Sequence, residues 1–151
     1  MTKNLTASME DYLETIVLLK KENSVVRVKD ISEMMSVKKP SVTGALNVLS
    51  AKGFIVHERY GYVDLTAEGE KRAQEIIQRH EMLVKFLSTV LKIGPGTASE
   101  DACRMEHAIS VETFKKLTKF IEFVEDSKDG ARPDWLKKFD TYYKKGKNKK
   151  V

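Results

Sequence analysis

Residues 29–66 constrain the fold more than any other stretch of the chain. A short amphipathic segment, residues 29–35, is followed by a four-residue turn and then by Pro40, which a helix tolerates in its first turn. Apolar residues recur beyond it at helical spacing until Gly53, a common helix stop. Residues 54–66 read as two short strands around a turn. With the amphipathic helix expected before them, these elements predict a winged helix-turn-helix, a geometry typical of DNA-reading modules.

Polar residues suited to DNA gather at the start and on the outer face of the helix that includes Pro40. Lysines, hydroxyls and a helix N-terminus can hold phosphates, while Thr43 and Asn47 can reach base edges. A solvated face used for protein contacts is the alternative, but no acidic residue falls between positions 37 and 57, which favours DNA. The predicted DNA-binding residues, two of them near the wing tip, are Lys38, Lys39, Pro40, Ser41, Thr43, Asn47, Arg59 and Tyr60.

Composition bounds the class of protein. The chain has 151 residues, 41% of them hydrophobic and 32% charged, which can supply a core for one ordinary domain or two small ones. It has no apolar run of about 18 residues, and its first residues lack the apolar core of a signal peptide. The single cysteine excludes an internal disulfide framework and fits a reducing cytoplasm. We therefore expect a cytoplasmic protein with no membrane partner.

The net charge of +5 weakly suggests a polyanionic partner. Much of this charge comes from five lysines at the C-terminus, Lys144, Lys145, Lys147, Lys149 and Lys150. Such a run is usually a solvated, disordered end and only sometimes a nucleic-acid arm. The location of the other basic residues is therefore more informative than the total.

The rest of the chain reads as helices. We expect a helix over residues 66–91 and then a break at 93–96. A helix capped by Thr97 or Ser99 should follow, and after it a helix over 111–125 capped by Ser110. Beyond a linker at 130–133, we expect a short helix over 134–139, after which the lysine tail frays. The predicted fold class is mainly α, with an N-terminal winged helix-turn-helix followed by an all-helical domain.

The stretch Cys103–His107 contains three side chains that can bind a metal. On a helix, Cys103, Glu106 and His107 stand at i, i+3 and i+4 of one face. A thiolate, a carboxylate and an imidazole are good donors for a divalent transition metal. We place them on the first two turns of their helix. The alternative is a buried cysteine, which behaves as a small apolar residue, beside a surface Glu-His pair.

Three further donor residues say little by themselves. Asp11 and Glu14 lie three residues apart on one face of the expected first helix, where two solvated carboxylates are the simpler interpretation. His80 lies beside Glu81 within the long helix, and a lone helical histidine is more often structural than a ligand. Only additional information could join these residues to Cys103, Glu106 and His107.

Five sequence blocks follow one another along the chain: residues 8–14 (SMEDYLE), 39–43 (KPSVT), 65–69 (LTAEG), 79–83 (RHEML) and 101–107 (DACRMEH). In this order and spacing they resemble the diphtheria toxin repressor family of metal-dependent transcriptional regulators, and within it the short manganese transport regulators. The similarity covers about residues 5–125. The resemblance implies a homodimer, formed through the C-terminal helices, that binds a double-stranded DNA operator and represses transcription. We accordingly expect a DNA-binding domain at residues 1–70, a metal-binding and dimerisation domain at 71–128, and a C-terminal short helix with a basic tail at 129–151.

The resemblance also implies a ligand set. Family metal ligands fall on Asp11, Glu14, His80, Cys103, Glu106 and His107, all of which are donor residues here. One implied site consists of Asp11, Cys103, Glu106 and His107. A second could use Glu14 and His80 and share Glu106. Metal held in this way would link the first helix to the dimerisation domain.

Several positions depart from either branch of the family. Manganese-type members have a carboxylate where this chain has Cys103, whereas iron-type members have a cysteine there. Iron-type members have a methionine where this chain has Asp11, so the set is a hybrid. Val84 and Ser99 stand where the iron-type second site has a glutamate and a histidine.

The donor chemistry ranks the metals. A mixed oxygen, nitrogen and sulfur site suits Fe(II), Co(II), Ni(II) or Zn(II) better than Mg(II) or Ca(II), and the thiolate lowers the preference for Mn(II). We expect Fe(II) as the effector and Mn(II) as the second choice, with Co(II), Ni(II) or Zn(II) as substitutes. Two alternatives remain: a metal-independent winged-helix DNA-binding or adaptor protein, and a metalloenzyme. Against an enzyme, no convincing nucleophile or general base stands beside the donors.

Overall fold

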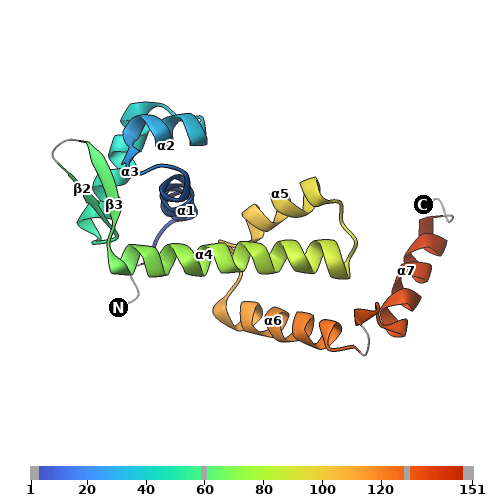
Figure 1. The fold of residues 1–151 in the computed structure, drawn as a ribbon. Helices are drawn as coiled ribbons and strands as arrows, with labels where there is room; N and C mark the ends of the chain where they lie inside the picture. Colours follow the sequence, from blue (N-terminus) through green and yellow to red (C-terminus); the bar gives the residue numbers. More distant parts are fainter. Residues whose placement is uncertain (1–3, 59–60, 128–129, 148–151) are drawn as a thin grey trace. The chain divides into compact units, whose positions relative to one another are not determined.

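The computed structural model describes residues 4–58, 61–127 and 130–147, which form helices and, within these ranges, one small sheet (Figure 1). The chain divides into two compact units, Met1–Arg79 and His80–Val151. In chain order the elements are α1 (Ala7–Glu22), β1 (Val26–Arg27), α2 (Val28–Met35), α3 (Lys39–Ala51), β2 (Ile55–His57), β3 (Tyr62–Leu65), α4 (Ala67–Lys85), the π-helix η1 (Phe86–Val90), α5 (Pro95–Met105), α6 (Val111–Glu125) and α7 (Asp134–Lys147). The predicted mainly α fold class is confirmed. None of the helices described could cross a membrane, because none is both long and apolar enough.

The first unit contains the predicted winged helix-turn-helix. α1 begins where Thr6 Oγ1 accepts a hydrogen bond from the backbone N–H three residues on, at 3.3 Å, as a helix cap does. α2 ends at Met35 and is followed by its cap residue Ser36, whose left-handed backbone (φ 54°) begins the short turn to α3. Pro40 lies in the first turn of α3, as predicted. Gly53 and Gly61 both have φ of 79°, a conformation that glycine adopts without strain, and they follow α3 and turn the wing.

A three-stranded antiparallel sheet completes this unit, in the order β1-β3-β2. Val26 pairs with Val63 and Ile55 pairs with Leu65. β1 has only two residues, because Val28 already begins α2. The core is formed by apolar side chains from α1, α2 and α3 that are completely buried, including Leu13, Ile16, Ile31, Leu46 and Leu49.

The start of α4 packs directly on the backbone of the loop before β2. Thr66 N donates to Phe54 O at 3.0 Å, and Thr66 Oγ1 donates to Gly53 O at 2.7 Å. A Cβ atom added at Gly69 would lie 1.8 Å from Phe54 O. Gly69 is therefore required by close approach of two backbone segments, whereas a Cβ at Gly44 in α3 would meet nothing within 4 Å.

We predict that Gly69→Ala lowers the free energy of unfolding by about 1–3 kcal/mol, the range typical of overpacking, because backbone atoms must move to admit the methyl group. Gly44→Ala is the matched control, since it should raise stability by about 0.5–1 kcal/mol through its higher helix propensity. Urea unfolding followed by circular dichroism measures both values. Equal effects of the two substitutions would contradict the close approach.

The second unit begins inside α4. We expected one helix to about Leu91, but the α-helical pattern ends at Lys85 and continues as the π-helix η1. The Ser88 hydroxyl donates to Val84 O at 2.7 Å, a side-chain bond that competes for a helical carbonyl. η1 packs against α5 and α6. Its Leu87 joins one apolar cluster and its Val90 joins another.

An arginine before α7 ties this last helix to η1. Arg132 donates to both carboxylate oxygens of Asp140, at 2.7 Å each, and to the carbonyl oxygens of Thr89 and Val90, at 2.6 and 2.8 Å. Leu136 is buried in the same cluster as Val90. The predicted end of this helix at residue 139 was wrong, because α7 continues to Lys147. Asp140, which Arg132 holds in place, lies just beyond the predicted end; we call this pair the anchor.

The anchor makes part of the stability depend on pH. The Arg132 side-chain hydrogen bond and then that of Lys92 lower the pKa of Asp140 to about 2, from about 3.9 in an unfolded chain. The folded state therefore favours the ionised carboxylate, and the stabilisation is complete above about pH 4 and is lost as the pH falls through about 2.

We predict that the difference in unfolding free energy between the wild type and Asp140→Asn shrinks as the pH falls from 5 to 2. Urea unfolding at intervals of pH measures it. The same comparison in an Arg132→Ala background is the control, and there the pH dependence should be smaller. A difference that stays constant with pH in the wild-type background would show that this carboxylate does not carry the effect.

Candidate metal centre and DNA-facing surface

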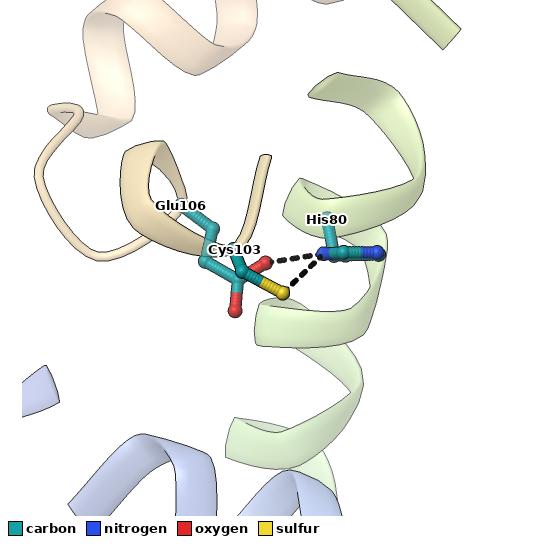
Figure 2. Close-up of side chains that lie close together, drawn as sticks. All are labelled: His80, Cys103 and Glu106. Atoms are coloured by element: carbon teal, nitrogen blue, oxygen red, sulfur yellow. Dashed lines mark hydrogen bonds and ion pairs between the residues drawn. The ribbon is translucent and has the colours of Figure 1, made fainter. Parts of the chain in front are cut away.

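Three donor side chains converge within the second unit. His80 lies on α4, Cys103 lies in the last turn of α5, and Glu106 caps the end of α5. His80 Nδ1 is 2.7 Å from Glu106 Oε2 and 3.7 Å from Cys103 Sγ (Figure 2). One ligand atom from each of the three residues lies within 4.8 Å of the others. The arrangement brings an imidazole, a thiol and a carboxylate to one point.

Glu106 is the buried member of this group, with a relative exposure of 1%. Its second carboxylate oxygen, Oε1, lies 3.2 Å from His107 Nε2. A buried carboxylate requires hydrogen bonds or a cation to offset its loss of hydration. Glu106 therefore faces one histidine with each oxygen, and Cys103 stands on the exposed side of the cluster.

The donor set fits a divalent transition metal. Imidazole nitrogen, thiolate sulfur and carboxylate oxygen bind such an ion at about 2.0–2.3 Å, which places a nitrogen and a sulfur ligand about 3.6 Å apart in a tetrahedral site. The distance of 3.7 Å between Cys103 Sγ and His80 Nδ1 agrees with that geometry. The 2.7 Å distance between His80 and Glu106 is that of a hydrogen bond, and metal ligation would take the place of its proton.

Two details of the sequence interpretation were wrong here. The helix that carries Cys103 begins at Pro95, with Gly94 before it, and neither Thr97 nor Ser99 is its cap. A proline is favoured at the first helical position, so the helix starts earlier than expected. Cys103 consequently lies in the last turn, and Glu106 and His107 follow the helix instead of standing on its first two turns.

Within the second unit, the structure brings together donors that the resemblance divided between two sites sharing Glu106. The implied first site paired Cys103 with His107 and assigned His80 to a second site. In the structure Cys103 lies beside His80, and Glu106 contacts both histidines. The contact between Cys103 and His80 joins residues that are 23 positions apart on different helices, so no local spacing could have predicted it.

Asp11 and Glu14 lie on α1 in the first unit, where both are half-buried. Their neighbour Glu10 is more deeply buried and pairs with Arg72 of α4. Sequence reasoning missed this ion pair, because the two residues are 62 positions apart. Glu10 has a structural partner within its own unit, and Asp11 and Glu14 are the metal-ligand candidates of α1 that the resemblance implies.

The predicted DNA-binding residues of the helix-turn-helix are on its surface. α3 buries Val42, Ala45, Leu46 and Leu49. The six residues of this helix and its N-terminus that were predicted to bind DNA are all exposed: Lys38, Lys39, Pro40, Ser41, Thr43 and Asn47. The first turn of α3 contains no acidic residue, so its N-terminal end is free to attract phosphate. Arg59 and Tyr60, predicted at the wing tip, lie outside the described residues.

Comparison with known proteins identifies both units. Residues 4–63 match the family model described as iron dependent repressor, N-terminal DNA binding domain, and residues 66–133 match its metal binding and dimerisation domain. An HTH-type transcriptional regulator of Methanocaldococcus jannaschii, itself uncharacterized, is 34% identical over 81% of this chain and 98% of its own. The HTH-type transcriptional regulator MntR of Lysinibacillus sphaericus is 33% identical over 89% of this chain and 93% of its own.

A solved structure agrees with these relatives. The manganese regulator SloR matches with a TM-score of 0.69 and 28% identity, over 82% of this chain and 55% of its own. This chain therefore spans about half the length of SloR. The family consists of transcriptional regulators and not of enzymes, which confirms the expectation of no catalytic activity. From these matches, the chain belongs to the iron-dependent repressor family, the metal-dependent transcriptional repressors of the diphtheria toxin repressor and MntR type.

Proposed function

We propose that this chain represses transcription by binding a double-stranded DNA operator as a homodimer, with Fe(II) as the first-ranked corepressor and Mn(II) as the second. The observation that carries the proposal is the convergence of His80, Cys103 and Glu106 in a chain that also has a winged helix-turn-helix. In this proposal residues 1–70 read DNA, 71–128 bind metal and form the dimer through the C-terminal helices, and 129–151 form an additional helix and basic tail. The protein acts in the cytoplasm, where its DNA target lies.

The DNA-reading role rests on the exposed face of α3. Lys38 immediately precedes α3, and Lys39 is its first residue. Their ammonium groups can bind phosphates beside the N–H groups at the N-terminus of this helix. Thr43 and Asn47 lie one turn apart on the same exposed face and can reach base edges in the major groove. Pro40 and Ser41 shape and extend this surface, and Arg59 and Tyr60 would add contacts from the wing.

The metal would be held by His80, Cys103, Glu106 and His107 of the second unit and by Asp11 and Glu14 of α1. When bound, the ion supplies positive charge and fixed coordination directions. The buried Glu106 carboxylate would orient His80 before any ion arrives, since its Oε2 lies at hydrogen-bond distance from the His80 ring. Ligands drawn from α1 and from the α5 end would couple metal binding to the reading helices. Such coupling works only through a higher affinity of the metal for the DNA-competent state.

Cys103 is the residue on which the metal ranking depends. Its thiolate is a softer donor than the carboxylate that manganese-type relatives have there, and a soft donor favours Fe(II), Co(II), Ni(II) and Zn(II) over Mn(II). The description of SloR as a manganese regulator points the other way for that protein, whereas the matching family models are described as those of iron dependent repressors. The proposal therefore ranks Fe(II) first on the chemistry of one side chain.

We predict that Cys103→Glu raises the affinity for Mn(II) relative to that for Fe(II) by at least about tenfold. Tenfold is the lower end of the change in metal affinity that follows when a residue beside a metal ligand is replaced. Anaerobic titration of the metal-free protein with Fe(II) and Mn(II), read by fluorescence anisotropy on operator DNA selected from genomic fragments, measures this ratio. In the wild type, promotion of DNA binding by Mn(II) but not by Fe(II) would overturn the ranking.

We also predict that Glu106→Gln lowers metal affinity by about 10–100-fold and removes metal-dependent operator binding, because the uncharged amide cannot offset the charge of the ion. Glu112→Gln is the control with the same chemical change, on an α6 side chain that is 79% exposed. Circular dichroism and mass measurement in solution check that the fold and the dimer persist in both variants. An unaltered metal response of folded Glu106→Gln would refute the site.

A further inference from the structure

The positive charge of this chain is concentrated at one end. Residues 130–151 carry eight basic and two acidic side chains, whereas the other 129 residues carry nineteen basic and twenty acidic ones. Residues 4–63, which match the DNA-binding domain, carry eight basic and seven acidic side chains and are almost neutral. Non-specific attraction to DNA depends on lysine and arginine near the phosphates. The DNA-binding domain therefore supplies little of the long-range attraction that such proteins use.

α7 presents much of this charge on an ordered helix. One side of α7 is fixed to its unit by the buried Leu136 and by Asp140, which accepts from Arg132 and pairs with Lys92 at 2.8 Å. Lys138 and Lys145 are seven residues apart and thus lie on a common helical face, away from the anchored side. Tyr142, between them on that face, is 78% exposed.

The acidic side chains of α7 are engaged elsewhere. Asp140 faces Arg132 and Lys92, and Asp134 at the other end pairs with Lys137 at 3.2 Å. The remaining lysines of α7 whose side chains are described, Lys138, Lys144 and Lys145, are exposed to solvent. The outer face of α7 therefore combines cations with a tyrosine hydroxyl, and both kinds of group bind phosphate oxygens.

We infer that Lys138, Tyr142 and Lys145 on the outer face of α7, together with the exposed Lys144 on its flank, form a second and sequence-independent surface for the DNA phosphate backbone. This inference rests on the proposed function, because it assigns α7 the same DNA partner. Charge complementarity with a polyanion is its basis. An anionic membrane would offer similar charge, and α7 also exposes Trp135 and Phe139, so the test must separate binding to DNA from binding to lipid.

The test measures how DNA affinity depends on salt, using the full-length chain loaded with Mn(II) or Fe(II). Removing one lysine that touches a phosphate reduces the slope of log affinity against log salt by about 0.9. The triple variant Lys138→Gln, Lys144→Gln and Lys145→Gln should therefore reduce the slope by as much as about 2.7 per protomer. Affinities for the operator and for a random duplex of equal length should fall by the same factor, since phosphate contacts carry no sequence information.

A matched control removes the same charge from the same unit. Lys115→Gln, Lys116→Gln and Lys119→Gln alter three exposed lysines of α6 and should leave the slope near the wild-type value. An unchanged slope in the α7 variant, or an equal decrease in the α6 variant, would overturn the inference. Loss of binding to phosphatidylglycerol vesicles by an α7 variant with an unchanged DNA slope would assign the face to membranes and would equally overturn it.

Failure of the proposed function gives a different result. In that case neither the wild type nor any variant would prefer the operator over the random duplex when metal is added. The slope measured on the random duplex would still report whether α7 contacts phosphates. The two ideas can therefore fail independently within one set of measurements.

Discussion

The burial of the Glu106 carboxylate is the interaction on which the candidate metal centre depends. Ionised carboxylates are rarely buried without a partner, because the loss of hydration costs several kcal/mol. Here one oxygen lies 2.7 Å from His80 Nδ1 and the other 3.2 Å from His107 Nε2. The contact with His80 joins the end of α5 to α4, whereas His107 is the next residue along the chain after Glu106. Cys103, three residues before Glu106, is thereby placed beside His80.

Such a site is suited to gain stability from a cation. A hydrogen bond between an imidazole and a carboxylate satisfies both groups only while a proton lies between them, and a divalent ion can replace that proton with a larger positive charge. A ligand that binds only the folded protein stabilises it in proportion to the logarithm of its concentration. Under the proposed function, metal supply and the rigidity of the α4–α5 contact would therefore be linked through Glu106.

Local sequence signals explain why the winged helix-turn-helix could be predicted. The arrangement of the candidate metal centre could be predicted only in part, because it depends on contacts between distant residues. Pro40 fixes its own φ at a helical value, and Gly53 and Gly61 permit the positive φ that their turns require. The donor residues were recognised through a family resemblance, but the pairing of Cys103 with His80 depends on how α5 packs, which no spacing within the sequence reveals. Burial of Glu10 against Arg72 was missed for the same reason.

The length of α7 shows how a tertiary anchor outweighs a charge pattern. Adjacent lysines suggest a frayed tail, yet lysine is a good helix former, and like charges one turn apart cost only about 0.2–0.5 kcal/mol per pair. Against this small penalty stand the buried Leu136 and the two-point hydrogen bond of Arg132 to Asp140, which hold the middle of the helix. Because the backbone is already ordered, lysines on the outer face lose less conformational entropy on binding an anion than they would on a disordered tail.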